Sequence, residues 1–283
     1  MILPTHLTPD PLHPWGPRLV DGPTRLVFET MGTVASLAAP GGMDAELRDR
    51  VQQVFAELDA RLSPFRFDSQ LSRVNAGELA VSEAGPEVRR AFELAHTWYL
   101  ETAGAFTPYA PGGGVDLNGV AKAMAIADAG ELLTAHAVGD WCLNVGGDVL
   151  VHGLDHESDR GEPWTAGIVH PGDSQSLLSI YRFASPRTSA IATSGVTERG
   201  EHIWRTDRRD AEDQFIQVSV VAGDIMTADV LATALLAGGQ DLLGEALRRW
   251  PIDVLAVTRA GQNLATSAFW ASGAEPLTAA HGR

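Results

Sequence analysis

The chain has 283 residues, 45% of them hydrophobic and 20% charged, which is enough apolar material for a sizeable packed core. Its formal net charge of -15 opposes a broad attraction to nucleic acid or to an anionic membrane surface, so a phosphate ligand would need a local cation. Only one cysteine is present, Cys142, which excludes a disulfide framework and a cysteine-rich zinc site. Its hydrophobic neighbours indicate a small core residue.

The two ends of the chain differ from the middle. Six prolines between Pro4 and Pro23 indicate an extended arm over residues 1–23, and residues 271–283 are typical of a frayed tail. The N-terminus has no basic region followed by an apolar region, and no later stretch is apolar without interruption over the length of a membrane span. We therefore expect a cytoplasmic protein without a membrane span, whose chemistry lies in one domain over residues 24–270.

Hydrophobic periodicity predicts helices and strands in mixed order between these ends. Apolar residues at spacings of three and four predict helices over residues 43–62, 84–103, 116–133 and about 225–238. β-Branched and aromatic runs predict two strands within residues 24–38, which meet near Met31, and further strands over residues 141–145, 149–153, 164–169, 187–193 and 215–222. A hairpin of residues 252–258 and 263–269 closes the chain. Because strands and helices do not alternate strictly, we expect an α+β fold, with a mainly antiparallel sheet and packed helices, rather than a doubly wound parallel sheet.

Asp229 and Thr233 form the most informative pair. They are four residues apart on the last predicted helix, so their oxygens lie one turn apart on the same face. Apolar residues surround that face, which predicts a buried carboxylate, and a buried carboxylate requires a cation or several hydrogen-bond donors. Oxygen ligands of this kind suit magnesium. The alternative is that Asp229 favours the N-terminal end of the helix dipole while Thr233 bonds to a backbone carbonyl.

Lys122 is the only lysine of the chain, since every other residue of the Lys/Arg type is an arginine. A compact ammonium kept at one position is typical of a phosphate contact. Lys122 also lies in the first turns of a predicted helix that follows Gly112-Gly113-Gly114, where backbone N–H groups favour an anion. Retention of one lysine by chance is the alternative.

Three further segments carry weaker signals. Asp148 follows two glycines at a strand end, where either a ligand-facing loop or a plain hairpin turn fits. Ser194 lies in a Thr-Ser-Gly turn that offers hydroxyls and amides to phosphate, although such turns are common. His202 has acidic neighbours that suit a general base, although an exposed loop histidine is the commoner case. The sequence motifs of Rossmann dehydrogenases, P-loop proteins, HExxH metalloproteases and GxSxG hydrolases are absent.

Seven short segments follow one another in an order that is specific as a set, although any one of them alone could arise by chance. They are Met31-Gly32-Thr33, Leu62-Ser-Pro-Phe-Arg-Phe-Asp-Ser-Gln-Leu-Ser-Arg-Val-Asn75, Gly104-Ala-Phe-Thr-Pro108, Asp116-Leu-Asn-Gly-Val-Ala-Lys122, Asn144-Val-Gly-Gly-Asp148, Ala192-Thr-Ser-Gly195 and Ala228-Asp-Val-Leu-Ala-Thr-Ala-Leu235. In this order the segments resemble the ApbE family, the FAD:protein FMN transferases. The resemblance runs from Thr30 to Phe269.

The resemblance implies an ApbE-like, T-fold-like architecture and gives roles to individual residues. The backbone carbonyl of Gly119 and the side chains of Asp229 and Thr233 correspond to the ligands of a Mg²⁺ ion. The implied catalytic residues are His202, as a base for the acceptor hydroxyl, and Asp229 at the metal. The positions that correspond to the FAD site are Met31, Phe65, Ala105, Phe106, Thr107, Asp116, Lys122, Ser194 and His202.

Three positions depart from the family pattern. Phe65 replaces a tyrosine, Thr107 replaces an aspartate, and Trp204-Arg205-Thr206 replaces Ile-Asp-Pro after the histidine segment. The resemblance implies that FMN passes from FAD to a Ser or Thr hydroxyl of an acceptor flavoprotein or redox subunit, with release of AMP. The alternatives are a FAD pyrophosphatase that gives FMN and AMP, and a non-catalytic FAD-binding protein.

Overall fold

The structure, a computed structural model, describes residues 23–110, 113–155, 161–196 and 214–272. The predicted N-terminal arm and most of the predicted C-terminal tail lie outside these ranges, so the domain boundaries stay predictions.

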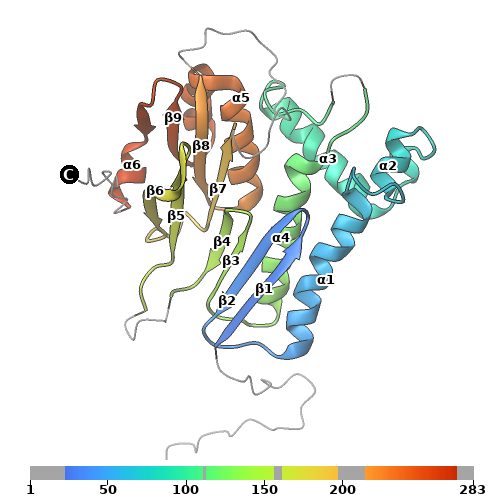
Figure 1. Ribbon diagram of the computed structural model, residues 1–283, viewed down its shortest axis with the longest axis horizontal. Coiled ribbons are helices and arrows are strands. Elements are labelled where there is room, and N and C mark those ends of the chain that lie inside the picture. Colours follow the sequence, from blue (N-terminus) through green and yellow to red (C-terminus); the bar gives the residue numbers. More distant parts are fainter. Residues whose placement is uncertain (1–22, 111–112, 156–160, 197–213, 273–283) are drawn as a thin grey trace, which may run out of the picture.

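An eight-stranded sheet forms the centre of the fold (Figure 1). Its strand order is β1-β2-β3-β4-β7-β8-β9-β10, and every neighbouring pair is antiparallel. The strands are β1 (Thr24–Thr30), β2 (Thr33–Ala39), β3 (Trp141–Val145), β4 (Asp148–His152), β7 (Ala190–Gly195), β8 (Phe215–Ala222), β9 (Asp253–Thr258) and β10 (Asn263–Ala265). The predicted α+β fold with a mainly antiparallel sheet is confirmed.

Three long helices pack on one face of this sheet and enclose the main core. They are α1 (Ala45–Leu62), α4 (Asn118–Ala135) and α5 (Ile225–Arg249), and α4 lies between the other two (Figure 1). Helix α1 begins where the side chain of Asp44 accepts a hydrogen bond from the backbone N–H of Leu47, at 2.8 Å. Its buried positions recur every three or four residues, as the sequence predicts.

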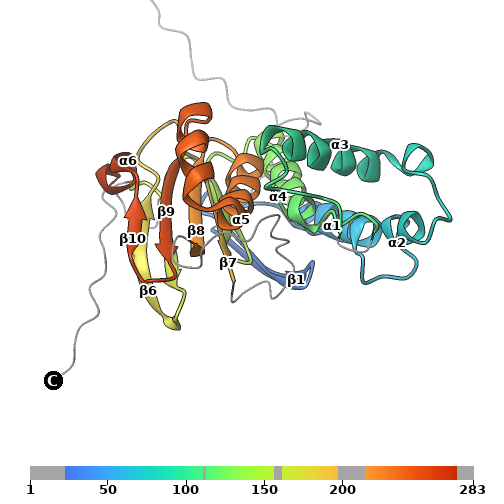
Figure 2. The same ribbon diagram turned by 90° about the horizontal axis from the view of Figure 1, so that it is seen from above.

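The shorter helices extend this layer. α2 (Gln70–Asn75), a 3₁₀ helix (Val81–Glu83) and α3 (Pro86–Glu101) follow α1, and α2 and α3 lie at the end of the molecule far from β9 (Figures 1 and 2). The predicted bounds of the helices before residue 136 are right to within two residues at each end, but α2 was not predicted.

A separate two-stranded sheet covers the opposite face of the large sheet. It consists of β5 (Thr165–His170) and β6 (Asp173–Arg182), and it encloses a second core with inward residues of β4, β7, β8 and β9 (Figure 2). The sequence predicts β5 but not β6. Six of the ten residues of β6 are polar or charged, so the strand lacks a clear apolar face.

The predicted closing hairpin is wrong in its second half. β10 ends at Ala265, and α6 (Ser267–Ala271) follows it. Thr266 caps this helix by accepting a hydrogen bond from the backbone N–H of Phe269 at 3.3 Å, and the Phe269 ring is fully buried in the second core. A short apolar run suits a strand or a helix, and the capping threonine explains why this one is helical.

The helix end predicted near residue 238 coincides with a break in the helix, but helical structure resumes after it and α5 extends to Arg249. Gly239 has φ 67° and ψ -156° inside α5, a conformation that glycine adopts without a steric penalty. By length and mean hydropathy α5 is the one described helix that would suffice for a membrane span. Its first half carries the buried Asp229 and packs on β7 and β8, as expected for a core helix.

Candidate functional site

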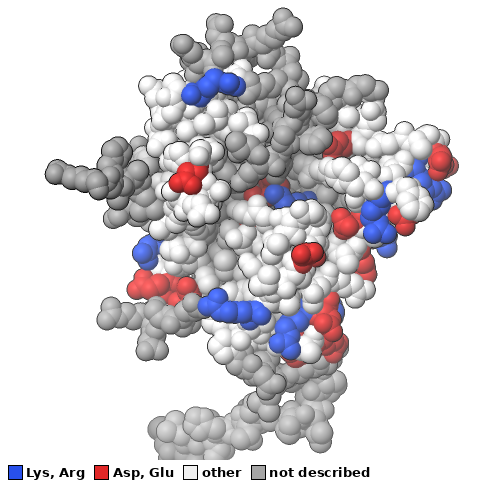
Figure 3. Space-filling model, viewed as in Figure 1, with Lys and Arg blue, Asp and Glu red and all other residues white. Residues whose placement is uncertain are grey.

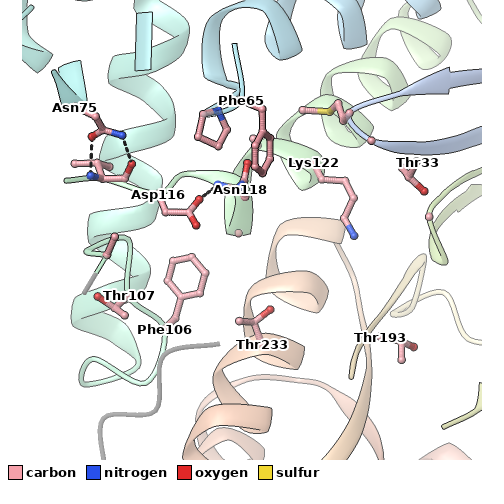
Figure 4. Close-up of a pocket in the computed structure, with 18 of the residues that line it drawn as sticks. Thr33, Phe65, Asn75, Phe106, Thr107, Asp116, Asn118, Lys122, Thr193 and Thr233 are labelled. Atoms are coloured by element: carbon pink, nitrogen blue, oxygen red, sulfur yellow. Dashed lines mark hydrogen bonds between the residues drawn. The ribbon is translucent and has the colours of Figure 1, made fainter. Parts of the chain in front are cut away.

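A cavity of about 950 Å³ lies where several segments of the chain converge (Figure 4). They are the β1–β2 turn, the loop before α2, the end of α2, the loop between α3 and α4, the start of α4, the β3–β4 turn, β7 at Thr193, and the face of α5 that carries Thr233. The volume is near the upper end of the range of about 300–1,000 Å³ that is common for small-molecule sites. Nine residues predicted for FAD or metal line it: Met31, Phe65, Ala105, Phe106, Thr107, Asp116, Gly119, Lys122 and Thr233.

Two polar residues, each through two hydrogen bonds, hold the chain just before α4. The side-chain amide of Asn75 pairs with the backbone of Val115, accepting from its N–H at 2.8 Å and donating to its carbonyl at 2.9 Å (Figure 4). Asp116 accepts from the backbone N–H of Asn118 at 2.9 Å and donates its own backbone N–H to the carbonyl of Pro108 at 2.8 Å. The loop is therefore held on both sides of Asp116, whose carboxylate accepts from the first backbone N–H of α4.

Gly119 and Phe106 touch closely at one wall of the cavity. The Phe106 ring is 4% exposed, and a β-carbon at position 119 would lie 2.7 Å from its Cε2 atom. Only glycine therefore fits at position 119 while the ring keeps this place. Thr102 anchors the segment, since its hydroxyl accepts from the backbone N–H of Phe106 at 3.0 Å.

Lys122 is the only basic residue among the described residues that line the cavity. Its side chain points toward the side on which Thr193 and Thr233 lie (Figure 4). Its ammonium forms an ion pair with the carboxylate of Asp148, a side chain that is 1% exposed. The other oxygen of Asp148 accepts from the backbone N–H of Thr193 at 3.3 Å. Asp148 therefore begins β4 as a buried partner of Lys122, and its carboxylate lies outside the cavity lining.

Thr233 brings helix α5 to the cavity. Its hydroxyl lies 3.0 Å from the hydroxyl of Ser194, which is fully buried, and either group is able to donate. The structure thus places Ser194 behind Thr233, and its neighbour Thr193 lines the cavity instead. Asp229 is fully buried one turn before Thr233, as the sequence predicts, and it is not among the lining residues.

The donors around Thr233 suit a hard cation. The described residues contain no cluster of three or more His, Cys, Asp or Glu side chains. A metal at this wall would therefore depend on one carboxylate together with hydroxyl, carbonyl and ligand oxygens. Asp229, Thr233 and the backbone carbonyl of Gly119 are the predicted members of such an all-oxygen set, and oxygen donors are those that Mg²⁺ prefers.

The mouth of the cavity is aromatic and open. Phe65 lines it while 84% exposed, and Phe67, two residues later, is 93% exposed. Met31 also lines the cavity, in the two-residue turn between β1 and β2, with φ 48°. That value fits the first position of a type I′ turn, so the strained backbone serves the hairpin. Figure 3 shows acidic and basic side chains side by side in a central hollow of this face.

Some polar lining residues differ from the predicted site, and one predicted residue lies outside the described ranges. Thr33, Asn75 and Asn118 line the cavity without having been predicted for the site, and Thr193 lines it as part of the Thr-Ser-Gly turn that the sequence offers to phosphate. Asn75 and Asn118 lie within the motifs quoted above, next to residues that were predicted for the site, and this proximity could have identified them. His202 lies outside the described residues, and its role stays a prediction.

The fold and the cavity define an α+β protein with a polar ligand site beside its sheet, at the junction of α4 and α5. A sequence profile of the ApbE family matches residues 31–112 and 109–256. The chain therefore belongs to the ApbE family, as its motifs predict.

Curated relatives match over part of their length. The FAD:protein FMN transferase of Vibrio cholerae is 29% identical over 136 residues, which make up 45% of this chain and 39% of that protein. The FAD:protein FMN transferase of Escherichia coli K12 is 25% identical over 161 residues, 54% of this chain and 44% of that protein. The chain thus spans less than half the length of either relative.

Solved structures share the fold over most of the chain. The flavin transferase ApbE of Vibrio cholerae has a TM-score of 0.69 at 22% identity, with 88% of this chain and 98% of that chain covered. The apo form of the Pseudomonas stutzeri flavinyl transferase ApbE has a TM-score of 0.70 at 20% identity, with 90% and 98% covered. At these identities the likeness concerns the fold.

Proposed function

We propose that this protein is a magnesium-dependent FAD:protein FMN transferase, which cleaves FAD and attaches FMN to a Ser or Thr hydroxyl of an acceptor protein. The observation that carries the proposal is the cavity formed by the ApbE motifs, which joins the Lys122 ammonium, the Thr233 hydroxyl and the exposed Phe65 ring. The curated relatives named FAD:protein FMN transferase support the same reaction. The acceptor is a flavoprotein or redox subunit.

FAD binding uses two kinds of lining residue for different chemistry. The apolar and aromatic surfaces of Phe65, Phe106 and Met31 bind the ring systems of the ligand. Lys122 donates hydrogen bonds to the pyrophosphate near Thr193 and Thr233. Because the chain carries a net charge of -15, local donors and cations are what hold this anion.

Asp229, Thr233 and the carbonyl of Gly119 hold the magnesium ion in this proposal. The bound ion supplies charge neutralisation for the pyrophosphate and for the charge that develops on the leaving phosphate. The hydroxyl of Ser194 supports Thr233 from behind, 3.0 Å away.

The transfer step replaces the phosphoanhydride bond of FAD by a phosphoester bond to the acceptor oxygen. The acceptor oxygen attacks the FMN phosphorus, the bond from that phosphorus to the bridging oxygen breaks, and AMP leaves with the bond's electrons. His202 takes the proton of the acceptor hydroxyl. Positioning of the two reactants and electrostatic stabilisation supply most of the acceleration, as in other phosphoryl transfers.

The test is to incubate the protein with FAD, Mg²⁺ and a candidate acceptor, and to measure released AMP together with covalent flavin fluorescence on a denaturing gel. We expect one AMP for each flavin that becomes attached. Turnover of FAD without any labelled acceptor, for each acceptor supplied, would contradict the transferase proposal.

A FAD pyrophosphatase is the second candidate, because Trp204-Arg205-Thr206 replaces the family's Ile-Asp-Pro after the histidine segment. In that reaction water replaces the acceptor hydroxyl, and the products are FMN and AMP. Release of both products from protein, FAD and Mg²⁺ alone would favour it. A bound yellow cofactor without turnover would favour a non-catalytic FAD-binding protein.

A further inference from the structure

The ion pair between Lys122 and Asp148 joins two residues that the sequence gives no reason to connect. Lys122 lies on α4 and Asp148 begins β4, 26 residues later in the chain. The lysine side chain is 18% exposed and reaches the cavity, whereas the aspartate side chain is 1% exposed. The carboxylate therefore meets the ammonium from inside the protein, on the side away from the ligand space.

The aspartate itself is held rigidly. β4 is paired with β3 on one side and with β7 on the other. The second carboxylate oxygen of Asp148 accepts from the backbone N–H of Thr193 on β7, at 3.3 Å. The position of the carboxylate is thus set by two neighbouring strands, and the ammonium that binds it takes its position from the sheet.

A contribution to the stability of the fold does not by itself explain why the chain has this buried ion pair. Two charges that leave water lose their hydration, and a well-packed apolar pair is often as stable as a buried ion pair. Lysine has a long side chain with many rotamers, so a free ammonium at the cavity wall would be spread over many positions. A fixed acidic partner restricts that spread.

We propose that Asp148 is a positioning residue, which holds the Lys122 ammonium so that its remaining N–H donors face the FAD pyrophosphate. An ammonium has three donors, and the pair with Asp148 engages one of them. This inference rests on the proposed function, because it takes the pyrophosphate as the ligand of Lys122. It adds a residue that contacts the ligand only through Lys122.

A positioning role and a purely electrostatic role of Asp148 predict opposite changes in FAD affinity. Asp148 is negative, so Asp148→Asn makes the cavity more positive and would tighten the binding of an anion if charge alone mattered. If position matters, the same variant weakens binding. Asp148→Glu sharpens the contrast, because it keeps the charge and moves the carboxylate by one methylene.

The experiment measures the FAD dissociation constant by flavin fluorescence at fixed Mg²⁺, for the wild type and for Lys122→Met, Asp148→Asn, Asp148→Glu and the Lys122→Met/Asp148→Asn pair. We expect each single variant to raise the constant about tenfold, the size of one charge-assisted hydrogen bond. The double variant should bind no more weakly than Lys122→Met, because Asp148 acts through the lysine.

Asp128→Asn is the matched control, since Asp128 of α4 also pairs with a basic residue, Arg90 of α3 at 2.8 Å, but lies outside the cavity lining. It should leave FAD affinity unchanged. Unchanged or tighter binding by both Asp148 variants, or a double variant whose loss equals the product of the single losses, would overturn the inference alone. A wild type that binds no FAD would overturn the proposed function and this inference together.

Discussion

Replacing Gly119 by alanine tests how tightly Phe106 closes the cavity wall. An added β-carbon would lie 2.7 Å from Cε2 and 3.0 Å from Cζ of Phe106, whereas ordinary contacts begin at 3.4 Å. The ring is 4% exposed and anchored through its backbone by Thr102, so it has little room to retreat. The substitution must therefore push the ring into the cavity or into the core.

Two opposing effects set the change in unfolding free energy. Overpacking of a filled site costs about 1–3 kcal/mol. Alanine gains up to about 1 kcal/mol over glycine inside a helix, and less than this in the first turn, where Gly119 lies. We expect Gly119→Ala to destabilise the fold by about 1–2 kcal/mol. In a Phe106→Leu background both clashing ring atoms are gone, so the same change should be neutral or stabilising.

Urea unfolding of the wild type, the two single variants and the double variant gives the coupling energy directly. We expect a coupling of about 1–3 kcal/mol, and weaker FAD binding by Gly119→Ala because the displaced ring borders the cavity. Gly41→Ala is the control, since nothing lies within 4 Å of its added β-carbon. Equal costs of Gly119→Ala in both backgrounds would refute the steric argument.

Three other predictions concern one buried and two partly buried groups. Asp229→Ala should abolish metal-dependent release of AMP while the protein still unfolds cooperatively; retained activity would remove the metal assignment. Burial raises the pKa of Asp253 above 3.8, so its protonated form stabilises the fold at low pH, and this contribution is lost as the pH rises through the folded pKa. Asp253→Asn should therefore flatten that fall in urea-unfolding stability, and parallel profiles would contradict it. Burial, with a smaller effect of Asp155, raises the pKa of Cys142 to about 12, so its thiol should react with a disulfide reagent at pH 8 much more slowly in the native state than in urea.

The predicted helices agree with the structure where apolar spacing and a capping residue, both visible in the sequence, determine the helix. α1 has apolar residues at helical spacing, and Asp44 caps its first turn, so the sequence contains both its extent and its start. The predicted closing strand failed because the apolar run around Phe269 suits either structure until a cap and the second core select one. β6 was missed because its pairing with β5 depends on residues outside its own pattern.

The site, too, has residues that local sequence predicts and residues that only the folded chain brings together. The chemistry of Lys122, Asp229 and Thr233 was visible from residue type and spacing, and the structure buries Asp229 and brings the other two to one cavity. The partner of Lys122 was not visible, because strand register and not spacing brings Asp148 to it. Ser194 was expected at the ligand and lies behind Thr233, since alternation along β7 turns Thr193 toward the cavity instead.

The charge of the cavity lining supports the proposal that FAD and a metal ion bind together. Lys122 and Asp116 are the charged residues among the described lining residues, and Asp148 already neutralises Lys122. The fixed charge near the ligand is therefore negative or close to zero, whereas the FAD pyrophosphate carries two negative charges. In the proposed function, a divalent cation held by Asp229 and Thr233 would supply the missing positive charge, in a site where electrostatic interactions are stronger than in water. Removal of metal with EDTA should thus weaken FAD binding at least about tenfold, the effect of one lost charge-assisted contact, and should do so even in a variant without transfer activity. Equal affinity with and without Mg²⁺, measured by flavin fluorescence, would show that Lys122 and the backbone suffice to hold the anion.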